Sequence, residues 1–78
     1  MNVTQSRMAR AGLGWSLDDL AREVKAVRPV SRRTIARFEA GGAVSADTVE
    51  TLRQCFVRAG VEFINGGRSM GVKVPRSD

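Results

Sequence analysis

Apolar residues recur at helical spacing over most of the chain and alternate with polar residues only near the C-terminus. A first helix is expected from Thr4 to about Ala11, and it ends at the GLG sequence of residues 12–14, because glycine ends helices at little cost. A second helix is expected to begin at Ser16, which can form a capping box with Asp19. Its apolar face consists of Leu17, Leu20, Ala21 and Val24.

The third expected helix is amphipathic and has a cationic face. Ser31 is its expected N-cap and Gly41 marks its end. At 100° per residue, Ile35 and Phe38 lie together on one side of the helix. The opposite side carries Arg32, Arg33 and Arg37.

A fourth helix and a hairpin complete the pattern. Ser45 caps the helix and Gly60 follows its end. Its apolar face consists of Thr48, Val49, Leu52, Cys55, Phe56 and Ala59. The tail VEFINGGRSMGVKV alternates on both sides of a glycine-rich turn, which predicts a two-stranded hairpin. Val61 and Phe63 are expected to share one face of it, with Val72 and Val74 opposite on the second strand.

These elements predict a mainly α fold in a single domain of 78 residues. We expect a helical part at about 4–60, a hairpin at about 61–74 and a short tail at 75–78. Cys55 is the only cysteine, so no internal disulfide can form, which is typical of a reducing compartment. Because neither a signal peptide nor a membrane-spanning stretch is visible, the sequence predicts a soluble cytoplasmic protein with no membrane partner.

Positive charge is concentrated in the middle of the chain. The net charge is +5, and residues 22–37 hold six basic residues against one acid, whereas the segments on either side are neutral. A basic run can be merely a solvated face. Because the whole excess of positive charge lies in this one segment, the sequence favours an anionic partner.

The residue types argue against catalysis. The chain has no histidine and no tyrosine, which removes the commonest general bases and proton donors. Cys55 lies in an apolar helix face, which favours a packed thiol over a nucleophile. Asp18 and Asp19 lie in a helix's first turn, where acids complement the helix dipole. We therefore expect no enzyme, no cofactor, no metal site and no small-molecule substrate.

Two segments, GWSLDDLA (14–21) and VSRRTIARFEAG (30–41), resemble the helix-turn-helix of the lambda-repressor-like family, the XRE class of bacterial and phage regulators. The resemblance covers about residues 5–64. It implies an all-helical domain that binds double-stranded operator DNA, usually as a homodimer, and represses or activates transcription. Residues 17–24 would then form the supporting helix and residues 32–40 the recognition helix.

The same resemblance and the chemistry of the side chains select candidate DNA-binding residues. The first residues of a recognition helix can reach base edges in the major groove. Arg32 and Arg33 occupy that position, and arginine can donate two hydrogen bonds to a guanine edge. Arg37, one turn further on, is better placed for a phosphate, as Ser31 also is.

An alternative function follows from two departures from the family pattern. Leu17 stands where the family usually has a glutamine, and the turn between the two helices is about four residues longer than usual and lacks glycine. Either the second helix gains a turn before Pro29, or an irregular loop forms. Apolar residues interleaved with bases would also suit an acidic protein surface. In this alternative the chain is an antiactivator that inhibits a transcriptional activator, for example in quorum-sensing or mobile-element control. Its partner-binding residues would be Val24, Lys25, Val27, Arg28, Pro29 and Val30.

Overall fold

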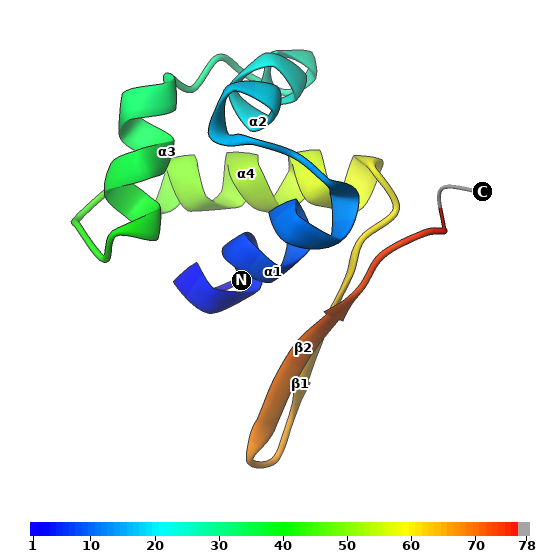
Figure 1. The fold of residues 1–78 in the computed structure, drawn as a ribbon. Coiled ribbons are helices and arrows are strands. Elements are labelled where there is room, and N and C mark those ends of the chain that lie inside the picture. The colour runs from blue at the N-terminus through cyan, green and yellow to red at the C-terminus, as the bar shows by residue number, and fades with distance from the viewer. Residues whose placement is uncertain (77–78) are drawn as a thin grey trace.

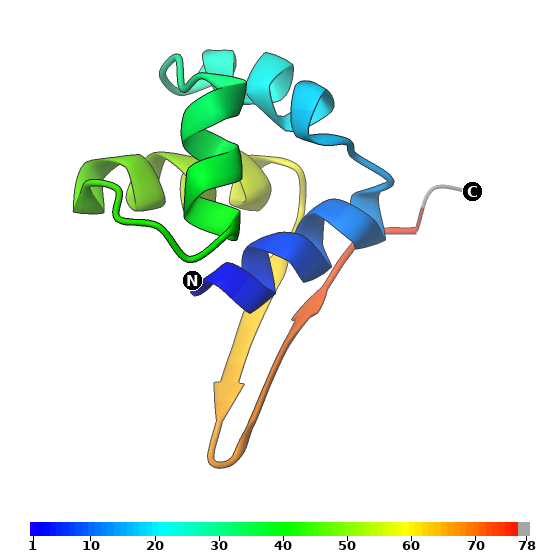
Figure 2. The same ribbon diagram turned by 60° about the vertical axis from the view of Figure 1, so that its left-hand side comes forward.

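The computed structural model describes residues 1–76, so the last two residues of the expected tail, 77 and 78, lie outside the described part. The elements are, in chain order, α1 (Val3–Leu13), α2 (Leu17–Glu23), the 3₁₀ turn η1 (Val24–Ala26), α3 (Arg32–Glu39), α4 (Ala46–Arg58), β1 (Glu62–Gly66) and β2 (Ser69–Lys73). The predicted fold class is confirmed: four helices pack together and a C-terminal hairpin projects from them (Figures 1 and 2).

Three predicted N-caps are confirmed. The hydroxyls of Ser16, Ser31 and Ser45 each accept a hydrogen bond from the backbone N–H three residues later, at 3.0–3.1 Å. Ser16 and Asp19 form the predicted capping box, because the Asp19 carboxylate also accepts from the Ser16 backbone N–H at 2.9 Å. The accepted hydrogen bonds lower the pKa of Asp19, the one from the Ser16 backbone most of all.

The first helix is longer at both ends than the sequence predicts. Asn2 caps it through a capping box with Gln5, so α1 begins at Val3 rather than Thr4. It continues through Gly12 because Gly14 is the residue that adopts the left-handed conformation, with φ of 71°. Gly12 is nevertheless needed for packing, because a Cβ there would lie 2.8 Å from Val74 Cγ1.

The core lies between the helices and the base of the hairpin. Its fully buried aromatic residue is Phe56, whose ring stacks on Trp15 at a centroid distance of 6.0 Å. Phe56 also meets the edge of Phe63 on β1 at 6.3 Å. The core residues are Ala9, Leu20, Val24, Ile35, Phe38, Leu52, Cys55, Phe56 and Val61. Aromatic contacts thus join the α1–α2 turn, α4 and the hairpin.

The hairpin has the predicted two-stranded antiparallel form. Phe63 pairs with Val72, and both side chains pack against the helical core. The Gln5 side-chain amide of α1 fixes the hairpin by donating hydrogen bonds at 3.2 Å to the carbonyls of Ile64 and Gly71 and to the side chain of Asn65. The hairpin is therefore held by α1 as well as by its own ladder.

Candidate nucleic-acid interface

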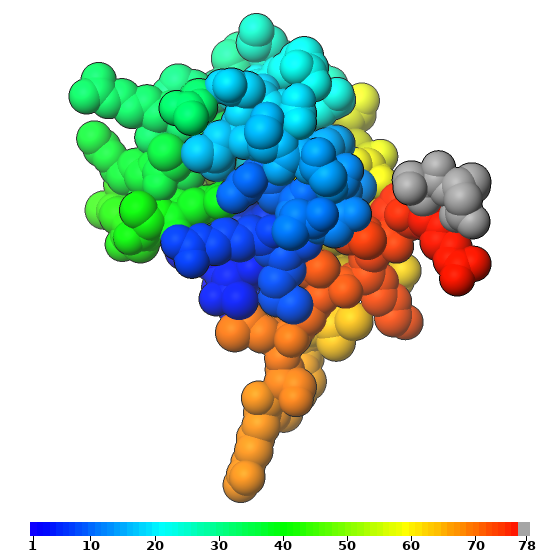
Figure 3. Space-filling model, viewed as in Figure 1, coloured from blue at the N-terminus to red at the C-terminus, as the bar shows by residue number. Residues whose placement is uncertain are grey.

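The helix α3 presents a cationic outer face over a buried inner face. Ile35, Phe38 and Glu39 are buried against the rest of the protein. The exposed residues on the other side include Arg32, Arg33 and Arg37. In Figures 1 and 3 this helix (green) lies at one side of the molecule, and long side chains project from it. All three candidate arginines are therefore exposed, and Arg32 lies on the side of α3 next to α2.

A buried ionic cluster ties α3 to α1. The Glu39 carboxylate accepts hydrogen bonds from Arg10, with the shortest contact at 2.7 Å from Nη2 to Oε1, and from the Ser6 hydroxyl at 2.9 Å. Arg10 also donates to the carbonyl of Trp15 at 3.1 Å, and Arg7 donates to the backbone carbonyl of Glu39. The hydrogen bonds to Glu39 raise the pKa of Arg10 despite its partial burial.

The sequence analysis missed this cluster, although one signal in the sequence indicates it. Glu39 follows Ile35 by four residues, so both lie on the same, buried side of α3. An acid in the last turn of a helix also lies near the negative end of the helix dipole. Its charge is unfavourable there, so a basic side chain is expected to bind it. The identity of that partner, Arg10, depends on how α1 packs and cannot be derived from spacing along the chain.

The three arginines differ in their contacts. Arg32 Nε lies 2.9 Å from the Asp18 carboxylate of α2, in a pair that is more than half exposed on both sides. Within residues 1–76, Arg33 and Arg37 form no ion pair. The stem of Arg37 lies over the turn that ends α3, where a Cβ at Gly42 would come within 2.7 Å of it. Arg33 is therefore the least constrained of the three.

The long turn before α3 folds compactly. The N–H groups of Val27 and Arg28 both donate to the carbonyl of Val24 at 2.9 Å, which closes the 3₁₀ turn, and a segment without regular secondary structure then leads to Ser31. The two forms expected for this turn, an added helical turn and an irregular loop, therefore occur one after the other. The extension is accommodated without displacing α3 from the core.

The structure corrects one of the candidate partner-binding residues. Val24 is fully buried in the core, so its side chain cannot contribute to a protein-binding surface. Val27 and Val30 are half-buried and pack against the core. The exposed residues among these candidates are therefore fewer and more basic than the sequence indicated: they are Lys25, Arg28 and Pro29, and Ala26 beside them is also exposed.

The start of α2 departs from a phosphate-binding helix end. Leu17 is half-buried and packs against the core, while Asp18 next to it is exposed. A carboxylate here repels phosphate, whereas an amide would attract it. This end of α2 lacks a phosphate-binding group, and it contacts α3 through the ion pair between Asp18 and Arg32.

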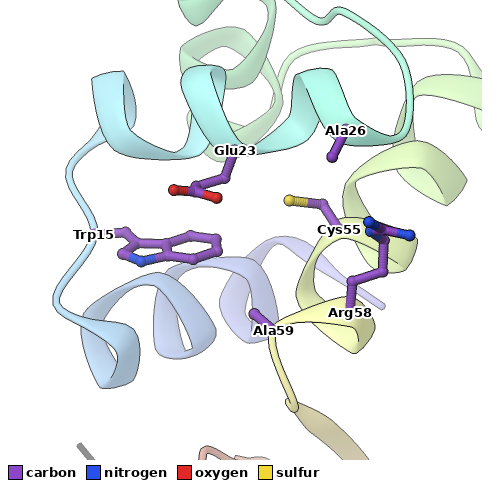
Figure 4. Close-up of a pocket in the computed structure, with 6 residues that line it drawn as sticks. All are labelled: Trp15, Glu23, Ala26, Cys55, Arg58 and Ala59. Carbon is purple, nitrogen blue, oxygen red and sulfur yellow. The ribbon is translucent and has the colours of Figure 1, made fainter.

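A small pocket of about 180 Å³ opens between α2, η1 and α4 (Figure 4). Glu23 and Arg58 lie on opposite sides of it, with the Trp15 ring beside Glu23. Burial raises the pKa of the Cys55 thiol to about 11, so the thiol is protonated at neutral pH. The lining residues are Trp15, Glu23, Ala26, Cys55, Arg58 and Ala59. The pocket shares no residue with the arginine face of α3.

A family model described as helix-turn-helix matches residues 7–56, which spans α1 to most of α4. No curated protein and no solved structure is a significant match to the chain. Among residues 1–76, no helix is long and apolar enough to cross a membrane.

Proposed function

The chain belongs to the lambda-repressor-like helix-turn-helix family of DNA-binding regulators, and from this premise we propose that it is a non-enzymatic transcriptional repressor whose helix α3 enters the major groove of operator DNA. The observation that carries the proposal is the arginine face of α3. Its three guanidinium groups are exposed, whereas the inner face is buried and anchored through Glu39. Occupancy of the operator excludes other proteins from the same DNA, so repression requires no further contact.

The residues of α3 have different proposed roles. Arg33, in the first turn and without an ion pair within residues 1–76, reads a guanine edge. Arg37 and the Ser31 hydroxyl contact phosphates, which fixes the position of the helix in the groove. Arg32 is oriented by Asp18 and contacts the groove through the guanidinium nitrogens that the carboxylate leaves free.

Arginine-to-alanine variants of α3 test these roles. Arg33→Ala is expected to lower the affinity for the preferred duplex by about 10- to 100-fold while leaving non-specific binding almost unchanged, because a bidentate base contact contributes about 1–3 kcal/mol of discrimination. Arg37→Ala is expected to weaken binding to all sequences and to reduce the salt slope by about one. The measurement is a titration of duplexes selected from a random pool, at several salt concentrations.

Arg53→Ala provides the control for the loss of one positive charge, since Arg53 lies on α4 and pairs with Glu50 at 2.6 Å. It should leave sequence preference intact. If the wild-type protein shows no sequence preference at moderate salt, the proposal of operator binding is wrong.

Removal of the acid beside α3 should have the opposite effect on affinity. Asp18→Asn is expected to tighten binding to all DNA sequences by up to about fivefold, because it removes repulsion of phosphate at the cost of a weak surface ion pair. Discrimination at the base pair nearest Arg32 should fall, because its guanidinium is no longer oriented. Glu50→Gln, which removes an acid from an exposed pair on α4, should change neither quantity. Equal behaviour of the two variants would argue against a position for Asp18 beside DNA.

The antiactivator alternative draws support from one observation. The exposed basic turn, with Lys25, Arg28 and Pro29 next to half-buried Val30, offers charge and apolar surface together and lies outside α3. The DNA titration separates the two functions. An antiactivator would lack a preferred duplex and would retain an activator protein in a pull-down, and Arg28→Glu, at an exposed position of the turn, would abolish that retention.

A further inference from the structure

The pocket between α2, η1 and α4 is lined by two opposite charges, Glu23 and Arg58 (Figure 4). Their side chains come from the last residues of α2 and α4 and lie on opposite sides of the pocket. Within residues 1–76 neither forms an ion pair, whereas the other acids of α2, Asp18 and Asp19, each pair with an arginine. The pocket therefore offers one negative and one positive group that the described fold leaves free to bind a ligand.

The two ends of the pocket suit different ligand groups. At one end, the Glu23 carboxylate lies beside the Trp15 ring (Figure 4), and this ring is held in place by its stacking on Phe56. A carboxylate next to an aromatic ring binds an organic ammonium group through an ion pair and a cation–π contact. At the other end, the guanidinium of Arg58 can donate two parallel hydrogen bonds to a carboxylate. The lining thus selects an ammonium group at one end and a carboxylate at the other.

The middle of the pocket is uncharged. Burial is the main cause of the raised pKa of the Cys55 thiol, with a further increase from Glu23 and a decrease from Arg58, so both charges act on this neutral thiol. The methyl groups of Ala26 and Ala59 complete the lining. Such a surface suits a short hydrocarbon chain. The volume of about 180 Å³ lies below the roughly 300 Å³ at which pockets for drug-sized ligands begin, so the ligand has to be small.

We infer that this pocket binds a small zwitterion of the ω-amino acid class, with its ammonium group between Glu23 and the Trp15 ring and its carboxylate on Arg58. The methylene chain between the two charges lies over the Cys55 thiol. An α-amino acid fits less well, because it carries both charges on one carbon and cannot place them on opposite sides of the pocket. Both charged side chains are exposed to solvent, so we expect a dissociation constant in the millimolar range.

Selectivity among three probes tests the inference. Trp15 is the only tryptophan and lines the pocket, so its fluorescence reports on binding at constant ionic strength. The probe 4-aminobutyrate should bind saturably. Butyrate, which lacks the ammonium group, and butylamine, which lacks the carboxylate, should bind at least about fivefold more weakly, because each makes only one of the two charge-assisted contacts. Equal binding of the three probes overturns the inference.

Substitutions at the two ends of the pocket separate their roles. Glu23→Gln should abolish the preference for 4-aminobutyrate over butyrate, and Arg58→Gln should abolish the preference over butylamine. Glu50→Gln and Arg53→Gln are the matched controls, since they remove the same charges from a pair on α4 that does not line the pocket. Both controls should keep the wild-type selectivity, and circular dichroism should show all four variants folded. Unchanged selectivity in Glu23→Gln or Arg58→Gln contradicts the inference.

NMR locates the binding site on the protein alone. Addition of 4-aminobutyrate should shift the backbone amide signals of Ala26 and Ala59 and leave those of Arg33 and Arg37 on α3 unchanged. Absence of saturable shifts, or an equal response of the two sets, overturns the inference. Because no DNA is present, the result does not depend on operator binding. A protein with no preferred duplex that still shows the selectivity for 4-aminobutyrate would contradict only the proposed function.

Discussion

Replacement of Phe56 by alanine is expected to lower the free energy of unfolding by about 3–5 kcal/mol, the largest effect of any substitution considered for this protein. The ring is fully buried, stacks on Trp15 and meets the edge of Phe63. Its loss leaves a cavity where the α1–α2 turn, α4 and β1 converge, and it removes two aromatic contacts as well as buried area. A domain of this length has a total stability of about 4–12 kcal/mol, so the substitution removes a large fraction of it and would unfold a domain at the lower end of this range.

Urea denaturation followed by fluorescence measures this effect directly. Trp15 is the only tryptophan in the chain and touches Phe56, so its emission reports on the region that loses the ring. Val57→Ala, one residue away and 47% exposed, should change the stability by no more than about 0.5 kcal/mol. Similar midpoints for the two variants would show that the three elements do not depend on the Phe56 ring.

Substitution of Glu39 by alanine is the second large effect, with an expected loss of about 3 kcal/mol. The side chain of Glu39 is only 6% exposed, and its removal leaves the Arg10 guanidinium and the Ser6 hydroxyl without their main acceptor. Because the same carboxylate fixes α3 against α1, DNA affinity should fall even in the folded fraction. The variant thereby affects the proposed reading helix without changing any of its arginines.

A double-mutant cycle isolates the contribution of the pair. Arg10→Met should destabilise the wild type strongly but add much less in the Glu39→Ala background, because the uncompensated charge has then been removed. Glu50→Ala is the matched control, since Glu50 also pairs with an arginine, at 2.6 Å, but on the surface of α4. If Glu39→Ala costs no more stability than Glu50→Ala, the cluster does not anchor α3.

Local rules predicted the helix boundaries where a serine caps the helix. Each serine hydroxyl accepts a hydrogen bond from the backbone N–H three residues later, so the start of the helix can be predicted from neighbouring residues alone. The three serines are Ser16, Ser31 and Ser45. The first helix was less well predicted, because the Asn2–Gln5 box does not follow the common serine or threonine pattern and because Gly14, rather than Gly12, provides the left-handed cap.

The candidate site was predictable in its charge but not in its contacts. Helical periodicity separates the arginines of α3 from Ile35 and Phe38, and in the structure the two apolar residues are buried while all three arginines are exposed. The Asp18–Arg32 and Arg10–Glu39 pairs join different helices, so they depend on packing that no local pattern encodes. The sequence analysis placed Val24 both on the apolar face of the second helix and among the partner-binding residues of the basic turn. In the structure Val24 is buried in the core, so the first assignment is correct.

The helix α1 is held on both sides. Glu39 of α3 binds its Ser6 and Arg10, and the hairpin carbonyls bind its Gln5. Folded structure therefore connects α3, the proposed reading helix, to the hairpin through α1. A change that displaces α1 would then alter the positions of α3 and of the hairpin together, although these two elements are far apart in the sequence.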